Sequence, residues 1–244
     1  MEKLFSYPIS VIYYLSFGLC LVFFHPIQWV CFNLFGYQAH KKSVDYLNFF
    51  LCKCTAILGT SYSFVNKDSI PKNVPIIFVA NHQSLYDIVG IIWHLRRFHT
   101  KFVSKMELGK GIPSVSYNLR HGGSVLINRN DPKQAIPLIK QLSEYIERSK
   151  RAALIFPEGT RSKNGIPKEF AQSGLKILCK HAPSAFIVPI TINNSWEMVK
   201  FGAFPMGLGN KLQFIIHNPI AVKDFPFEEL ILKTESTIKQ AIKV

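Results

Sequence analysis

Two hydrophobic patterns divide this chain of 244 residues. Residues 4–40 contain no Asp, Glu, Lys or Arg, and within them Phe5 to Phe24 form an apolar run of 20 residues. Such a run is long enough to cross a hydrocarbon core of about 30 Å. His25-Pro26 is expected to break the helix, because proline disfavours the helical conformation of the residue before it. A second apolar piece, Ile27 to Phe35, is too short to span alone and ends at Gly36.

The apolar N-terminus predicts a membrane-anchoring helical segment over residues 1–40. One spanning helix and a re-entrant helix pair held in one leaflet both fit, and the proline with the short second piece favours the pair. A secretory signal peptide is disfavoured, because no small-x-small cleavage site follows the apolar run. Residues 41–70 are expected to form an amphipathic connector, in which Val44 to Leu58 lies along the membrane or packs on the core.

In residues 71–244, short apolar runs alternate with amphipathic segments. Strands are predicted at residues 75–80, 100–104, 124–128, 152–156, 186–192 and 211–217, and helices at residues 84–97, 132–149, 168–181 and 226–242. The second of these helices is the best marked, since Asp131 caps it and Pro132 occupies its first turn. Strands that alternate with helices predict an α/β domain, with a mostly parallel or mixed sheet flanked by helices.

Charge and cysteine content restrict the partners and the compartment. The chain carries 29 Lys and Arg against 15 Asp and Glu, a net charge of +14, which indicates an anionic partner such as a phospholipid surface or a phosphorylated substrate. Nucleic acid is not expected, because there is no arginine-rich arm and the aromatic residues lie in apolar runs. The five cysteines lack the spacing of a disulfide framework, which fits a reducing compartment. No metal site and no cofactor are predicted, because the histidines form no spaced sets with acids.

The candidate chemistry is concentrated in Asn81-His82-Gln83-Ser84-Leu85-Tyr86-Asp87, a segment between a strand-like and a helix-like run. Imidazole accepts a proton from a hydroxyl near neutral pH, and a carboxylate on its other nitrogen fixes its tautomer and direction. His82 and Asp87 are therefore candidates for a base and its orienting group. The structural alternative is a capping box, in which Ser84 caps the helix and Asp87 closes it.

Three further blocks follow along the chain: Gly123-Ser124-Val125-Leu126-Ile127-Asn128-Arg129, Phe156-Pro157-Glu158-Gly159-Thr160-Arg161-Ser162 and Val188-Pro189-Ile190. In this order the four blocks resemble those of the lysophospholipid acyltransferase family, of which 1-acylglycerol-3-phosphate acyltransferase is the archetype. The first and third blocks are specific as a pair, and the resemblance covers roughly residues 70–195. The last block is expected to be a buried strand whose proline lies at an edge or a bulge.

Acyl transfer from a thioester to an alcohol needs a base, and the resemblance implies His82 as that base with Asp87 as its partner. The substrate hydroxyl then takes the place of a serine nucleophile. Backbone N–H groups near Gly159 are expected to bind the oxyanion. Arg161 is the expected phosphate ligand, and Glu158 is expected to bind glycerol hydroxyls or to hold Arg161. Together the residues expected to bind substrate are Lys105, Arg129, Glu158, Gly159, Thr160 and Arg161.

The resemblance implies a membrane-bound enzyme that transfers a fatty acyl chain from acyl-CoA or acyl carrier protein to the free hydroxyl of lysophosphatidic acid. Alternatives are an acyltransferase or transacylase for another lysophospholipid or a lyso-ornithine lipid, a hydrolase that uses Ser84, and a non-enzymatic lipid-binding protein. The chain departs from the family pattern after Pro113, where a glycine is common, and at Ala171, where lysine is common. These departures leave the acceptor head group open. The expected location is the inner (plasma) membrane, with the active site on its cytoplasmic face.

Overall fold

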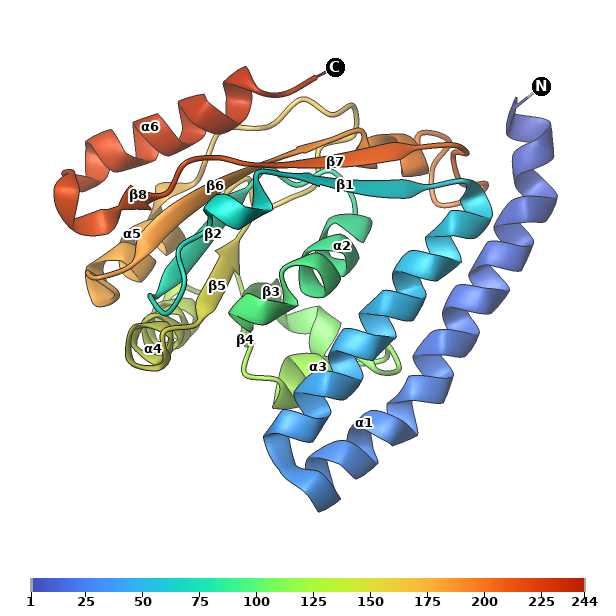
Figure 1. Cartoon of the computed structure of the whole chain (residues 1–244), viewed down its shortest axis with the longest axis horizontal. Coiled ribbons are helices and arrows are strands. Elements are labelled where there is room, and N and C mark those ends of the chain that lie inside the picture. The colour runs from blue at the N-terminus through green and yellow to red at the C-terminus, as the bar shows by residue number, and fades with distance from the viewer. Residues whose placement is uncertain (1, 244) are drawn as a thin grey trace.

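The computed structural model describes residues 2–243 and contains an eight-stranded mixed sheet with helices on both faces (Figure 1). Its helices and strands are α1 (Glu2–Thr55), β1 (Ser61–Val65), β2 (Ile76–Ala80), α2 (Tyr86–His94), β3 (Lys101–Lys105), α3 (Val115–His121), β4 (Val125–Ile127), α4 (Pro132–Ser149), β5 (Ala152–Ile155), α5 (Gln172–His181), β6 (Phe186–Asn193), β7 (Lys211–Ile216), β8 (Ile220–Ala221) and α6 (Phe227–Gln240). All six predicted strands and all four predicted helices of the α/β part are present, and the predicted fold class is confirmed.

The order of the strands brings several loops to one edge of the sheet. The order is β1-β7-β6-β2-β5-β3-β4, with β8 beside β6. Strands β6, β2, β5, β3 and β4 run parallel, whereas β7 and β8 run antiparallel to β6. Because the carboxyl ends of parallel strands meet at the same edge, the loops after β2, β3, β4 and β5 converge there.

Strand β2 lies in the middle of the sheet and is buried on both faces. Ile76, Phe78 and Ala80 belong to the core formed with α2 and the start of α1. Ile77 and Val79 belong to the core formed with α4, α5 and α6. This double burial is the reason that β2 is a continuous apolar run instead of an alternating one.

Helix α1 is a hairpin of two arms that lie side by side (Figure 1). The helix continues through Pro26, so the predicted break at His25-Pro26 is wrong. A proline removes one backbone hydrogen bond, and here that loss does not end the helix. The chain turns instead at Gly36, with φ 77° and ψ −175°, a conformation that costs glycine little because it lacks a Cβ atom.

The second arm of the hairpin, residues 37–55, packs on the α/β part of the protein. Leu47 and Leu51 of this arm form a small apolar cluster with Phe24 of the first arm and Val89 of α2. Of the two arrangements expected for Val44 to Leu58, the structure therefore shows packing on the core.

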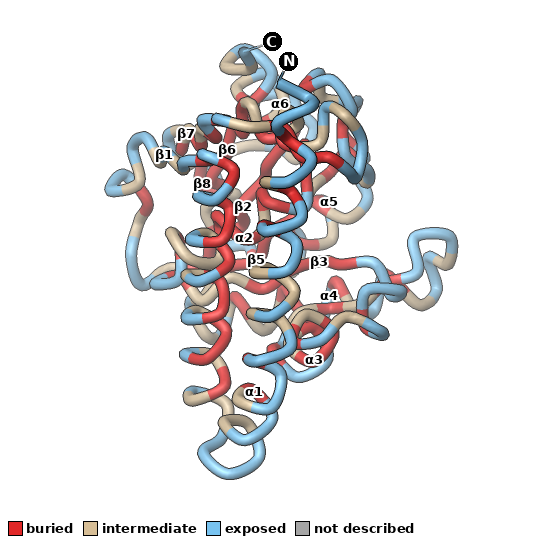
Figure 2. Tube along the Cα trace, turned by 90° about the vertical axis from the view of Figure 1, so that its right-hand side faces the viewer, coloured by how far each residue is buried: buried red, intermediate tan, exposed pale blue. Residues whose placement is uncertain are grey.

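The first arm of the hairpin, residues 2–35, has its apolar face outward. Ser6 and Ser10 are fully buried, whereas Phe5, Leu15 and Leu19 are 64%, 63% and 68% exposed. Figure 2 shows the same exposure along this arm and around the turn at the end of the hairpin. A helix on the surface of a water-soluble protein has the opposite arrangement. Large apolar side chains exposed along one face are typical of surfaces that contact a membrane or another protein.

Pro189 lies in an interior strand, at a gap in the pairing of β6. On one side of β6, β8 pairs with Phe186 and Ile187, and β7 pairs from Ile190 onward. Between them the Pro189 carbonyl accepts a hydrogen bond from the His217 N–H at 3.0 Å. The strand is buried as expected, but of the two positions expected for the proline the edge is wrong. The proline occupies a place where no ladder N–H is needed.

Candidate active site

The loop that follows β2 carries the candidate base. The distance from His82 Nδ1 to Asp87 Oδ2 is 2.8 Å. The imidazole stacks on Phe156, with ring centroids 4.0 Å apart and an angle of 16° between the planes. When Nδ1–H donates to the carboxylate, Nε2 carries the free lone pair. His82 lines a cavity at this edge of the sheet, so Nε2 is the ring nitrogen available to a substrate hydroxyl.

Asp87 is fully buried, and one of its oxygens accepts three hydrogen bonds. Besides His82, Oδ2 accepts from the backbone N–H groups of Gln83 at 2.8 Å and Ser84 at 2.9 Å. These two N–H groups precede α2, so the carboxylate also satisfies donors at the start of that helix. The capping and orienting interpretations therefore describe the same carboxylate, and its buried charge is well solvated by donors.

The Ser84 hydroxyl is 1% exposed and does not line the cavity. Its Oγ accepts a hydrogen bond from the Tyr86 N–H at 3.1 Å and contacts the Ser195 hydroxyl. These contacts favour a structural role for Ser84 over that of a nucleophile.

Two amide side chains fix the loop of His82 to the rest of the fold. The Asn81 side chain accepts from the Ile192 N–H at 2.7 Å and donates to the Ile192 carbonyl at 2.8 Å. Since Ala80 is the last residue of β2 paired with β6, this amide extends the ladder by one position. Gln83 Oε1 accepts from the Ser195 N–H at 2.9 Å. The candidate base is therefore held by the central strands of the sheet.

Replacing Asn81 by alanine is expected to destabilise the protein by about 2–3 kcal/mol, because it leaves the buried Ile192 N–H and carbonyl unpaired. For a chain of this size, the melting temperature should fall by about 5–10 °C. Thermal unfolding in detergent measures the effect, with the exposed Asn218→Ala as control. An unchanged melting temperature for Asn81→Ala would show that Asn81 does not fix this loop.

Glu158 ties the loop after β5 to the loop of His82. Its Oε1 accepts from the His82 N–H at 2.7 Å, and its Oε2 accepts from the Lys168 N–H at 2.8 Å. The side chain is 8% exposed, and burial raises its pKa. Within residues 2–243 it makes no ion pair with Arg161. These contacts connect the two loops, and Glu158, although expected to bind substrate, is not among the residues that line the cavity described next.

A cavity of about 190 Å³ lies between these loops and the end of β3. Its polar side is formed by most of the residues predicted to bind substrate, namely Lys105, Arg129, Gly159, Thr160 and Arg161. Its apolar side is formed by Ile88, Phe102, Val103, Leu108 and Phe156. None of its three cations forms an ion pair with a described carboxylate. The cavity is therefore suited to a small anionic group beside an apolar chain.

The backbone N–H groups near Gly159 differ in whether they already have an acceptor. Gly159 has φ +69°, and its N–H donates to the Phe156 carbonyl at 3.1 Å. The Ser162 N–H donates to the His82 carbonyl at 2.8 Å. In the described part of the chain, the N–H groups of Thr160 and Arg161 have no such partner. These two are the donors available to an oxyanion.

Two curated proteins are similar to this chain in sequence over part of their length. The chain is 36% identical over 135 residues to a 1-acyl-sn-glycerol-3-phosphate acyltransferase of Helicobacter pylori, a match that covers 52% of this chain and 54% of that protein. It is 29% identical over 154 residues to the chloroplastic 1-acyl-sn-glycerol-3-phosphate acyltransferase LPAT1 of Arabidopsis thaliana, covering 63% of this chain and 42% of that protein. The chain thus spans about half the length of these curated relatives.

The fold has a counterpart among solved structures. The 1-acyl-sn-glycerophosphate (LPA) acyltransferase PlsC from Thermotoga maritima superposes with a TM-score of 0.77, over 98% of this chain and 95% of that chain, at 24% identity. The family model named Acyltransferase matches residues 61–193, which include all four sequence blocks and the cavity residues. Because this match covers more than half of the chain, the protein belongs to the Acyltransferase family.

Proposed function

We propose that this protein transfers a fatty acyl chain from an acyl thioester to the free hydroxyl of lysophosphatidic acid, giving phosphatidic acid. The observation that carries the proposal is the His82–Asp87 pair, because His82 lines a cavity whose three cations form no ion pair with a carboxylate of residues 2–243. Relatives named 1-acyl-sn-glycerol-3-phosphate acyltransferase support the same substrate class.

In the proposed reaction, His82 Nε2 takes the proton of the acceptor hydroxyl as its oxygen attacks the thioester carbonyl carbon. A C–O bond forms, and the oxyanion is bound by the N–H groups of Thr160 and Arg161. When the intermediate collapses, the C–S bond breaks and the imidazolium returns its proton to the thiolate. Asp87 holds the ring and stabilises its charged form. The products are the ester and the free thiol.

The cations of the cavity are proposed to hold the acceptor phosphate. Arg161 lies on the same loop as the oxyanion donors, and Lys105 and Arg129 belong to the same cavity. A volume of about 190 Å³ is below the range of about 300–1,000 Å³ typical of drug-sized ligands, so it suits a glycerol phosphate head group better than a whole lysolipid. The acyl chains would then extend along the apolar side and out of the cavity. The thioester donor is acyl-CoA or acyl carrier protein.

Contact with a membrane surface is proposed for the hairpin of α1. Among the described residues, one helical segment, Glu2–Leu58, is apolar and long enough to cross a membrane, with a mean hydropathy of 1.8 in its most apolar window. Because α1 turns back at Gly36, we favour an arrangement in one leaflet. Residues 2–40 of the expected anchor and residues 41–55 of the expected connector belong to this hairpin, whereas residues 61–65 of the expected connector form strand β1 of the sheet. The proposed site of attachment is the cytoplasmic face of the inner (plasma) membrane.

The test is acyl transfer by detergent-purified protein, with palmitoyl-CoA and palmitoyl carrier protein offered as separate donors. Phosphatidic acid formed from lysophosphatidic acid supports the proposal and identifies the donor. A panel of lysolipids that differ in head group, including lyso-ornithine lipid, separates the alternatives. Preference for another acceptor would overturn the assignment of lysophosphatidic acid, and release of free fatty acid without transfer would indicate a hydrolase.

Replacing Arg161 by alanine is expected to raise KM for lysophosphatidic acid about 10- to 100-fold, because a charge-assisted hydrogen bond contributes about 1.5–3 kcal/mol. The kcat value should change much less, since the phosphate is bound equally in the ground and transition states. Initial rates at varied acceptor concentration measure both constants. The matched control is Lys163→Ala, two residues along the same loop and outside the cavity. Equal KM values for the two variants would contradict the role given to Arg161.

A further inference from the structure

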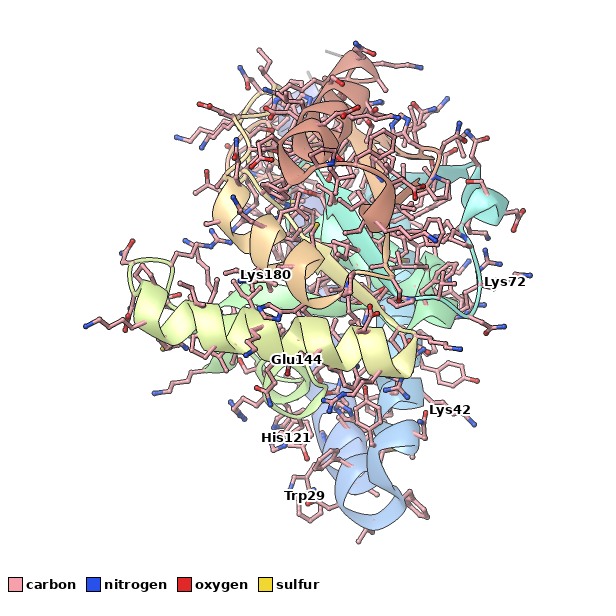
Figure 3. The ribbon with its side chains drawn as sticks, turned by 90° about the vertical axis from the view of Figure 1, so that its left-hand side faces the viewer. Trp29, Lys42, Lys72, His121, Glu144 and Lys180 are labelled. Carbon is pink, nitrogen blue, oxygen red and sulfur yellow. The ribbon has the colours of Figure 1, made fainter. Side chains whose placement is uncertain are left out.

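A second cavity lies between the turn of the α1 hairpin and α4, and we call it the hairpin cavity. Its volume is about 540 Å³, and its wall includes Phe32 and Tyr37 of α1, Tyr145 of α4, and Arg151 just before β5. His121, at the end of α3, also lines it, and Figure 3 shows His121 between α4 and the hairpin. The volume is within the range of sites for small organic ligands.

The hairpin cavity is separate from the site of His82. Lys101 at the start of β3 lies behind the wall of the hairpin cavity, and Lys105 at the end of β3 lines the active-site cavity. Four residues of strand place the two ends about 13 Å apart. The hairpin cavity is therefore at the edge of the sheet opposite the catalytic loops.

Arg151 gives the hairpin cavity a cation that no acid neutralises. Its guanidinium lies 5.8 Å from the ring centroid of Tyr37 and 5.5 Å from that of Tyr145, and it donates a hydrogen bond to the Tyr145 hydroxyl. None of the carboxylates in residues 2–243 lies within ion-pair distance of Arg151. The aromatic rings hold the guanidinium in place and leave its remaining N–H groups for a ligand.

Lys101 adds a second cation behind the wall of the cavity. It is 5% exposed, and its Nζ donates to the Tyr37 hydroxyl and to the Gly122 carbonyl. Gly123, with φ +83°, lines the cavity, and a Cβ atom there would be 3.8 Å from Lys101 Nζ. Burial lowers the pKa of Lys101 to about 7. An anion in the cavity would stabilise the charged form of this amine.

Next to the hairpin cavity is a small pocket of about 40 Å³ that shares Tyr37 and Ser124 with it. His40 and Thr100 line this pocket. His40 is 1% exposed, and neither of its ring nitrogens has a hydrogen-bond partner among the described residues. The Thr100 hydroxyl is likewise unpaired there. Buried polar groups are normally satisfied, so these polar atoms point to a bound polar group or to ordered water that connects to one.

The position of the hairpin cavity indicates where its ligand comes from. Phe32 in its wall lies on the last turns of the first arm, near the exposed side chains of Trp29, Leu34 and Phe35, which are 52%, 68% and 71% exposed. Figure 3 shows Trp29 further along the same end of the hairpin, beyond His121. If this end enters the lipid, the cavity lies at the depth of the phosphate groups, where tryptophan side chains are also concentrated.

We propose that the hairpin cavity binds the phosphate group of an anionic phospholipid of the membrane, at a site separate from that of the acyl acceptor. This site would set the depth and orientation of the hairpin relative to the sheet, because its residues come from both. The inference uses the proposed membrane contact of α1, but it does not depend on acyl transfer.

The test is binding of the full chain to vesicles of phosphatidylcholine, with and without about one-fifth phosphatidylglycerol. Arg151→Gln is expected to lower the gain in affinity from the anionic lipid about fivefold, the effect of about one cation at such a surface. Arg151→Lys keeps the positive charge and should therefore keep most of the gain in affinity. This variant distinguishes the loss of charge from a general effect of replacing Arg151 on folding. Lys150→Gln is the matched control, an exposed neighbouring cation outside the hairpin cavity, and should bind like the unmodified chain. His82→Ala should also bind normally, whether or not it transfers acyl groups.

Three results would overturn the proposal. Equal losses for Lys150→Gln and Arg151→Gln would show general attraction to a charged surface. An undiminished gain for Arg151→Gln would show that the cavity does not bind the lipid. The third result comes from titration calorimetry with inorganic phosphate. If Arg151→Gln no longer binds inorganic phosphate but still binds the anionic vesicles, the ligand of the hairpin cavity is a soluble phosphate compound and not a lipid.

Discussion

Replacing His82 by alanine is expected to lower kcat for acyl transfer by about 10²- to 10⁴-fold, the usual contribution of a positioned general base. The reason is that His82 Nε2 is the free nitrogen of a ring whose other nitrogen is held by Asp87 at 2.8 Å. No other histidine lines the cavity in the described structure. The measurement is the initial rate of phosphatidic acid formation at saturating donor and acceptor.

The fold should survive this substitution. The carboxylate of Asp87 keeps its two backbone donors, Gln83 and Ser84, so no buried charge is left unpaired. The melting temperature of His82→Ala should therefore stay within a few degrees of that of the unmodified chain. Ser84→Ala is the companion variant, and it should retain most of the activity. Full turnover by His82→Ala, or silence of a folded Ser84→Ala, would contradict the mechanism.

The parts of the fold that were predictable are those with a strong local signal. The helix α4 was placed at its observed bounds, because its cap, its proline and its apolar face agree. The strands β2, β5 and β6 were found because burial on both faces gives a continuous apolar run. The strand β1 gives no such signal, since it is a short edge strand that alternates exposed and half-buried residues. Helix α3, with seven residues, is also too short for a clear period.

The hairpin of α1 shows that a proline does not by itself determine where a helix ends. A proline preceded by an apolar run predicts a break, yet the helix continues through Pro26 and turns at Gly36. The position of the turn depends on packing between the two arms, for example Phe24 against Leu47 and Leu51, and the sequence does not display such pairs. The sequence predicts an edge or a bulge for Pro189 for a similar reason, because the gap between β7 and β8 exists only in the assembled sheet.

For the candidate site, the residue types were predictable but several contacts were not. The motif blocks predicted that His82, Arg129 and Arg161 come together, and the end of a predicted strand added Lys105. The structure brings these four residues to one cavity, with Asp87 buried behind His82. It was not predictable that Glu158 accepts from two backbone N–H groups, or that Asn81 and Gln83 bind distant backbone. These are contacts between residues far apart in the chain, and only their polar character inside apolar surroundings gave a signal.

Replacing Asp87 by asparagine is expected to lower kcat by about 10- to 100-fold, which is less than the loss for His82→Ala. The N–H groups of Gln83 and Ser84 both donate to Oδ2, so the amide oxygen of asparagine should occupy that position. The NH₂ group of the asparagine then takes the place of Oδ1. In the structure, Asp87 Oδ1 lies 3.4 Å from the Ser84 hydroxyl. His82 Nδ1–H keeps its acceptor, and Nε2 keeps its lone pair. What is lost is the charge that stabilises the imidazolium, about 1.5–3 kcal/mol.

This prediction separates three roles for the carboxylate. If Asp87 only caps α2, Asp87→Asn should alter the melting temperature and leave kcat unchanged. If the asparagine turned its NH₂ group toward the imidazole, it would impose the wrong tautomer and cost about 10⁴-fold. A loss of kcat of about 10- to 100-fold follows only when the Gln83 and Ser84 N–H groups fix the asparagine side chain and the negative charge beside the imidazolium is missing. The comparison of kcat and melting temperature for Asp87→Asn, His82→Ala and the unmodified chain decides among them, and a value of kcat equal to that of the unmodified chain would remove Asp87 from the mechanism.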